Sequence, residues 1–178
     1  MTRRSLRVPL LSANTERSPD PVFPLGAACM AAVAEREGHA VATLDLCFVD
    51  TPARVVSDAL RTFDPEVIGI SLRNLDSATY PEQHSYVDDY RGLVAGLRAS
   101  SNAPIVLGGS GFTVMPTTSM EFVNADVGVE GALMEGIEAY GFEHSNRIVP
   151  GKSIRTDTEG LRRLRARKIK GQLGRLLR

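Results

Sequence analysis

Short apolar runs alternate with polar, glycine-rich and proline-rich segments along residues 6–131. The runs are mostly uncharged and rich in β-branched residues, which is typical of strands that a parallel sheet buries on both faces. They predict five strands, at residues 6–13, 40–46, 67–72, 104–109 and 125–131. Pro9 interrupts the first run and counts against a regular central strand there, because proline lacks the amide hydrogen that a sheet uses.

Helical spacing of apolar residues predicts helices between these strands, at residues 25–38, 51–65, 86–100 and 117–124. The predicted apolar face of the first helix consists of Leu25, Cys29, Ala32 and Val33. Gly38 provides its stop, and Thr51 with Pro52 forms a typical start for the second helix. Strands and helices that alternate in this way predict an α/β fold: a doubly wound, Rossmann-like or flavodoxin-like, mostly parallel five-stranded sheet with flanking helices.

The chain has 178 residues, of which 43% are hydrophobic, and this is enough for one domain with a real core. No apolar run approaches the roughly 18 to 20 residues of a membrane-spanning helix, and the first residues do not resemble a signal peptide, so we expect a cytoplasmic protein. Cys29 and Cys47 match no disulfide or zinc pattern, and we expect both to be buried as small apolar residues.

Charge divides the chain into two parts, although the formal net charge is zero. Residues 152–178 carry ten Lys and Arg against two acidic residues, whereas the rest carries eleven against nineteen. A domain at residues 1–146, followed by a connector and a basic tail at 147–178, is therefore predicted. The tail is either a solvated or disordered end, or an amphipathic helix at 161–178 that docks on a partner protein; nucleic acid and membrane are less favoured partners.

Ligands of doubly wound sheets bind beyond the carboxyl ends of the strands. After the fourth predicted strand stands Gly108-Gly109-Ser110-Gly111, where the glycines could admit a bulky ligand or simply turn the chain. A dinucleotide fingerprint would require such glycines after the first strand, and the "PGKS" string at 150–153 lacks the upstream glycine of a phosphate loop. Nucleotide binding is therefore not supported.

Acid–base or metal chemistry has one candidate, His84, which lies in the long polar segment 73–89 near Glu82, Asp88 and Asp89. The spacing matches no metal motif, and a solvated loop is the favoured interpretation. His39 is expected to be a surface or partly packed residue.

Four blocks, "FPLGAACMAAVAEREGHAVATLDL", "PEVIGISLRNLD", "APIVLGGSGFTVMP" and "ADVGVEG", occur in this order between residues 23 and 131. Their combination and spacing resemble the cobalamin-binding N-terminal domain of cobalamin-dependent radical S-adenosylmethionine (SAM) enzymes. The resemblance implies a corinoid across the carboxyl edge of the sheet. The implied cofactor-binding residues are Leu25, Gly26, Ser71, Leu72, Arg73, Asn74, Gly108, Gly109, Ser110, Gly111, Phe112, Glu130 and Gly131.

The sequence departs from related patterns in ways that limit what the resemblance implies. Residues 82–87 do not form the Asp-x-His-x-x-Gly motif that supplies a histidine ligand in other corinoid domains, so no histidine lower ligand is expected. Glu130 and Gly131 are followed by Ala132 where the family usually has a second acidic residue. The C-x-x-x-C-x-x-C motif is missing, so no [4Fe-4S] cluster of that kind is expected in this chain.

The sequence thus predicts a cobalamin-binding module related to radical SAM methyltransferases, without the catalytic barrel and not catalytic alone. The chain would then be a stand-alone cobalamin carrier, a subunit whose catalytic partner is another chain such as a radical SAM protein, or a part of a longer enzyme. Two alternatives stay open: a Rossmann-like regulatory or interaction domain without a ligand, and an enzyme that uses His84 and neighbouring carboxylates.

Overall fold

The computed structural model describes residues 4–77, 81–130 and 147–150. Its strands form a single sheet in the order β2-β1-β3-β4-β5-β6. Their bounds are β1 Arg7–Ser12, β2 Ala40–Asp45, β3 Ile68–Ser71, β4 Ile105–Gly108, β5 Val127–Glu130 and β6 Arg147–Pro150. Strands β1 to β5 are parallel, and β6 pairs antiparallel with β5. The predicted five-stranded parallel α/β sheet is therefore confirmed.

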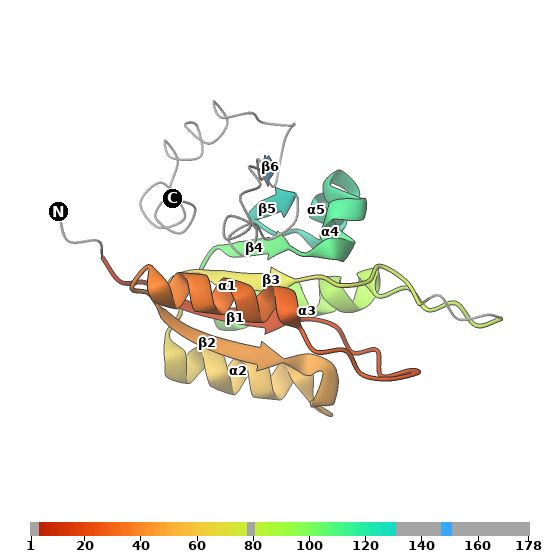
Figure 1. Cartoon of the computed structure of the whole chain (residues 1–178), viewed down its shortest axis with the longest axis horizontal. Helices are drawn as coiled ribbons and strands as arrows, with labels where there is room; N and C mark the ends of the chain where they lie inside the picture. Colours follow the sequence, from red (N-terminus) through yellow and green to blue (C-terminus); the bar gives the residue numbers. More distant parts are fainter. Residues whose placement is uncertain (1–3, 78–80, 131–146, 151–178) are drawn as a thin grey trace.

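The order of the first five strands is the flavodoxin-like order, in which the connections run to opposite sides of β1. The helices are α1 Leu25–Arg36, α2 Pro52–Phe63, α3 Val87–Ser100, α4 Ser110–Val114 and α5 Pro116–Val123, with a short 3₁₀ turn, η1, at Leu46–Phe48. Helix α1 lies over one face of the sheet (Figure 1). Helices α2, α3 and α5 pack against one another in that order around the opposite face.

Each face of the sheet has its own apolar core. The larger core joins the sheet to α2, α3 and α5 through residues such as Leu60, Leu97 and Met120. The smaller core lies under α1 and includes Leu6, Val8 and Ala31. No helix in the described part of the chain has both the length and the apolar character needed to cross a bilayer.

Proline at position 9 does not displace β1 from the centre of the sheet, contrary to the expectation from sequence. In β1 the main chain of the odd-numbered residues faces β3, since Arg7 O accepts from the amides of Glu66 and Val67, and Ala13 N donates to Ser71 O. Pro9 therefore lacks a donor only on that side, and the ladder with β3 begins one residue later, at Leu10.

The buried face of α1 also differs from the prediction. Ala27, Ala31 and Ala34 are buried, whereas Leu25 is 66% exposed and Ala32 is exposed. The helix is apolar nearly all round, so apolar periodicity does not select one face. Alanines on the buried side allow the helix to lie close to the sheet.

Two elements were not predicted. Helix α4 begins within the glycine-rich segment that was expected to be a loop, and α5 follows it directly. Strand β6 lies at residues 147–150, which were assigned to a connector, and it extends the sheet beyond β5. The division of the chain at residue 146 and the amphipathic tail stay predictions, because residues 131–146 and 151–178 lie outside the described part.

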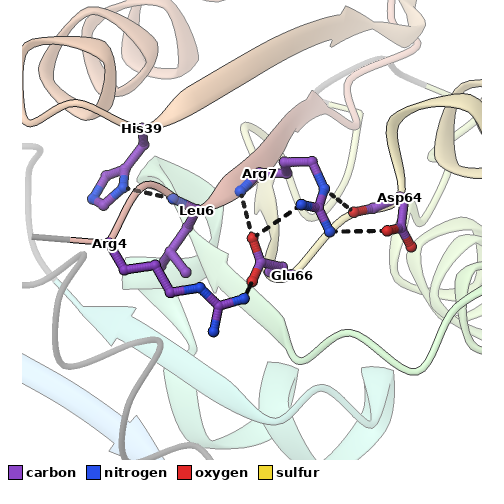
Figure 2. Close-up of polar contacts among 6 residues, drawn as sticks. All are labelled: Arg4, Leu6, Arg7, His39, Asp64 and Glu66. Atoms are coloured by element: carbon purple, nitrogen blue, oxygen red, sulfur yellow. Dashed lines mark hydrogen bonds and ion pairs between the residues drawn. The ribbon is translucent and has the colours of Figure 1, made fainter.

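At the amino edge of the sheet, polar side chains from three segments, residues 4–7, 39 and 64–66, join the start of β1 to its neighbours (Figure 2). Glu66 is buried; its carboxylate accepts from Arg7 N at 3.2 Å and forms ion pairs with the Arg4 and Arg7 guanidinium groups. Nearby, His39 is buried rather than on the surface, and its Nδ1 accepts from Leu6 N at 3.2 Å. This edge is therefore an anchor for β1.

We expect Glu66→Ala to lower the free energy of unfolding by roughly 1–3 kcal/mol, because the substitution leaves the Arg7 amide without its acceptor and removes two ion pairs. Urea denaturation measures the change. Asp64→Asn is the matched control, since Asp64 also pairs with Arg7 but is 85% exposed, and its effect should stay within about 0.5 kcal/mol. Equal effects of both substitutions would contradict the anchoring role of Glu66.

Candidate functional site

The carboxyl ends of β1, β3, β4 and β5 meet at one edge of the sheet (Figure 1). Register places Ser12 beside Ser71, and Ser71 beside Gly108. The connections after β1 and β3 leave toward opposite faces, and the two long loops that follow these strands extend past the edge (Figure 1). Such a switch point is where open α/β sheets bind their ligands.

Beyond the ends of β3 and β4 the two chains remain bonded to each other. Leu72 N donates to Gly108 O at 2.8 Å, and Gly111 N donates to Leu72 O at 2.9 Å. The Ser110 hydroxyl donates to Arg73 O at 3.1 Å. Residues 71–74 and 108–111 therefore form one structural unit, which we call the paired turn.

The glycines of the paired turn have a structural reason that the sequence did not reveal. A Cβ on Gly109 would lie 2.5 Å from Leu72 O, and Gly109 has a φ of +101°. A Cβ on Gly111 would lie 2.9 Å from the carbonyl carbon and oxygen of Arg73. The missing side chains thus make room for the main chain after β3. They do not by themselves indicate space for a ligand.

The predicted site residues differ in how accessible they are. Leu72 and Phe112 are completely buried and Gly111 is buried, so these three support the edge from inside. The partly exposed residues are Gly26, Ser71, Asn74, Gly108, Gly109 and Glu130. The exposed residues are Leu25, Arg73 and Ser110. Gly131 lies outside the described residues.

Two hydrogen bonds join the loop after β1 to the end of β3 and to the loop that follows it. Ala13 N donates to Ser71 O at 3.1 Å, and the Tyr86 hydroxyl donates a short hydrogen bond to the Glu16 carboxylate. That bond lowers the pKa of Glu16, while burial and the Glu16 carboxylate raise the pKa of Tyr86 to about 12. The hydroxyl and carboxylate therefore stay in their bonded protonation states at neutral pH.

Tyr90 supports the paired turn from the side of α3. Its ring is buried and its hydroxyl donates to Asn74 O at 2.6 Å, while burial raises its pKa. The Tyr90 ring also lies 6.4 Å from the ring of Tyr86. These contacts hold the chain after β3 in a defined position.

The alternative site around His84 has a simple surface geometry. His84 Nε2 lies 2.9 Å from Asp89 Oδ2, and both side chains are more than half exposed. Among the described residues no three His, Cys, Asp or Glu side chains are grouped so that they could hold a metal ion. The contacts favour the interpretation of a solvated loop.

Asn14 is a residue of this edge that sequence analysis did not single out. It follows β1 by two residues, is 3% exposed, and its Oδ1 has no hydrogen-bond partner in the structure. The available signal was a polar residue directly after a buried strand. One such residue in a polar loop is too common a pattern to be chosen from sequence alone.

Exposed apolar side chains lie in the segments that come directly after the carboxyl ends of three strands. They come from the loop after β1 and the start of α1, from η1 after β2, and from the junction of α4 and α5 after β4. The set is Val22, Phe23, Leu25, Phe48, Val114 and Met115. Exposed apolar groups beside hydrogen-bonding main chain suit a large ligand that has both apolar faces and polar edges.

Comparison with known proteins identifies the type of domain. The family model of the B12 binding domain matches residues 12–140. Tryptophan 2-C-methyltransferase from Streptomyces laurentii is 29% identical over 119 residues, which are 66% of this chain and 20% of that protein. The chain therefore spans about a fifth of the length of this curated relative.

Two solved structures of the radical SAM methyltransferase TsrM from Kitasatospora setae have the same fold. The structure with tryptophan and a SAM analogue bound has a TM-score of 0.66 and 30% identity, over 75% of this chain and 24% of that one. The structure with cobalamin and a [4Fe-4S] cluster bound has a TM-score of 0.68 and 25% identity, over 85% and 32%.

These findings confirm the resemblance that the four sequence blocks suggested. The matched region begins at Ser12, the last residue of β1, and includes the carboxyl ends of β3, β4 and β5. Because the family model covers well over half of the chain, this protein belongs to the B12-binding domain family, and its cofactor is cobalamin.

Proposed function

We propose that cobalamin lies across the carboxyl edge of the sheet, over the paired turn and the switch point between β1 and β3. The observation that carries this placement is the paired turn itself, where Arg73 and Ser110 are exposed. Leu25 and Met115 lie exposed at the start of α1 and at the junction of α4 and α5, which follow β1 and β4. A corinoid combines a broad ring with amide-bearing edges, and this mixture of main chain, hydroxyl and apolar groups fits it.

Among the predicted site residues, we assign the accessible ones as contacts of cobalamin and the buried ones as residues that hold these contacts in place. The proposed contacts are Leu25, Gly26, Ser71, Arg73, Asn74, Gly108, Gly109, Ser110 and Glu130. Leu72, Gly111 and Phe112 position them from the core. Gly131, which the sequence also suggested, remains a proposed contact next to Glu130.

Cobalamin, when bound, supplies a cobalt centre that can accept and donate a methyl group. This chain's contribution is to hold and orient the cofactor on a rigid edge, where Tyr90 fixes Asn74 and Ser110 fixes Arg73. Residues 82–87 around His84 do not form the Asp-x-His-x-x-Gly motif, so we propose that His84 does not ligate the lower face.

We propose further that the bound cofactor serves a methyl transfer carried out with a radical SAM unit. The support is that the cobalamin-bound relative also carries a [4Fe-4S] cluster, and that the present chain corresponds to about a third of it. Only Cys29 and Cys47 are available here, so the cluster would be held by other residues than those of this chain. Docking of that unit through residues 161–178 stays a prediction.

The test is to mix the full 178-residue chain with hydroxocobalamin, remove free cofactor by gel filtration, and measure the corinoid absorbance that co-elutes. We expect about one equivalent with the wild type. Ser110→Leu should lose most of it, because the larger side chain would occupy the exposed edge.

Ser100→Leu is the matched control. Ser100 is an exposed serine at the opposite edge of the sheet, and its hydroxyl likewise donates to a main-chain carbonyl, Gly96 O at 3.2 Å. It should bind like the wild type. If the wild type itself retains no corinoid, the interpretation as a ligand-free regulatory or interaction domain is favoured instead.

A further inference from the structure

Asn14 lies where the sheet changes direction. Ala13 N donates to Ser71 O at 3.1 Å, so Asn14, the next residue, lies near the ends of both β1 and β3. Asn14 is 3% exposed. A polar side chain is therefore buried at the switch point of the fold, next to the start of the paired turn.

The hydrogen bonds of this side chain are incomplete. An asparagine amide offers two donor hydrogens and one oxygen acceptor. Nδ2 of Asn14 donates to Glu16 O at 3.4 Å, a long and weak bond, while Oδ1 is buried without any partner. Buried polar atoms are normally bonded, so an orphan acceptor is a cost that the protein carries in this form.

The donors of this loop and its neighbours do not remove this cost because they already donate to Glu16. Cys47 Sγ donates to Glu16 O at 3.5 Å, and the Tyr86 hydroxyl and Ser18 N donate to the Glu16 carboxylate. The loop thus holds Asn14 in place while its acceptor stays open. An acceptor in this state has affinity for one chemical class, a hydrogen-bond donor from outside the protein.

We propose that Asn14 is a further binding residue of the cofactor site, and that its Oδ1 accepts a hydrogen bond from a donor group of cobalamin. This inference rests on the proposed placement of the cofactor. The cofactor has two kinds of donor that can be told apart, the amide groups on the corrin side chains and the ribose hydroxyls of the nucleotide tail. The phosphate and the benzimidazole lone pair are excluded, because they offer acceptors only.

If Asn14 binds the cofactor, its replacement should lower the affinity for cobalamin without lowering the stability of the cofactor-free protein. Asn14→Leu keeps the branched shape and the number of heavy side-chain atoms, and it removes the orphan acceptor together with only a weak 3.4 Å bond, so the thermal midpoint of the cofactor-free protein should not fall. Its affinity for hydroxocobalamin, measured by absorbance titration, should fall roughly tenfold or more, since a buried hydrogen bond is lost. Asn14→Asp keeps an acceptor oxygen and should bind more tightly than Asn14→Leu. Asn102→Leu, at an exposed position before β4, should change neither quantity.

Cobinamide, which lacks the nucleotide tail, identifies the donor. If Asn14→Leu weakens cobalamin and cobinamide alike, the donor is an amide of a corrin side chain; if only cobalamin is weakened, it is a ribose hydroxyl. Unchanged affinity for both would overturn the proposal, and so would a lower midpoint of the cofactor-free Asn14→Leu protein, because Asn14 would then be structural. Failure of the wild type to bind cobalamin would instead reject the proposed function itself.

Discussion

Gly109→Ala is expected to lower the free energy of unfolding by about 3–5 kcal/mol. Gly109 has φ +101° and ψ 173°, a region of backbone space that is nearly restricted to glycine. The added Cβ would also lie 2.5 Å from Leu72 O and 2.9 Å from Ser71 Oγ. Backbone strain and a clash with main chain therefore act together, and the measurement is urea denaturation of both proteins.

Gly92→Ala provides the control for this prediction. Gly92 lies in the middle of α3, and an added Cβ would have no atom within 4 Å. The same chemical change should raise stability there by about 0.5–1 kcal/mol, because alanine favours the helix. A mild effect of Gly109→Ala, similar in size to that of Gly92→Ala, would show that the paired turn can relax around a side chain.

Phe112→Ala should cost about 3–5 kcal/mol of stability, the range for a large side chain removed from a core. Phe112 has no exposed surface and belongs to the larger core on the side of α2, α3 and α5. A Cβ on Gly128 would lie 2.2 Å from its ring, so β5 is fitted closely against it. The effect should appear in the cofactor-free protein, which thermal unfolding without cobalamin measures.

Phe122→Ala is the matched control, since Phe122 on α5 is 40% exposed and its ring faces the Arg91 guanidinium at 5.0 Å. Its loss should cost no more than about 1 kcal/mol. If Phe112→Ala left the stability of the cofactor-free protein unchanged and affected only cobalamin binding, Phe112 would be a cofactor contact, as the family resemblance implied.

The fold could be predicted from sequence because its signals are local. Gly38, Thr51 and Pro52 mark helix ends within a few residues of where the structure has them, and uncharged runs mark the strands. The face of α1 could not be predicted, since a nearly all-apolar helix lacks a polar side. Strand β6 was missed because antiparallel pairing with β5 depends on a contact across an intervening segment.

The strand ends that the sequence suggested do meet at one edge of the sheet, whereas the position of the cofactor there and the roles of the individual residues remain predictions. The position of Gly109 and Gly111 after a strand suggested either space for a ligand or a simple turn, whereas both glycines face residues 72–74, more than thirty positions earlier. The sequence could not single out Asn14 for the same kind of reason, because tertiary contacts decide whether a buried polar atom has a hydrogen-bond partner.

The glycines of this domain differ in whether another residue can replace them during evolution. Side chains at 109 or 111 would meet main-chain atoms, which every residue type possesses, so no second substitution elsewhere can relieve the clash. At Gly128 the obstacles are the side chains of Phe112 and Met120, which can be exchanged for smaller ones. Among related sequences we therefore expect the first two glycines to stay fixed, and position 128 to vary together with position 112.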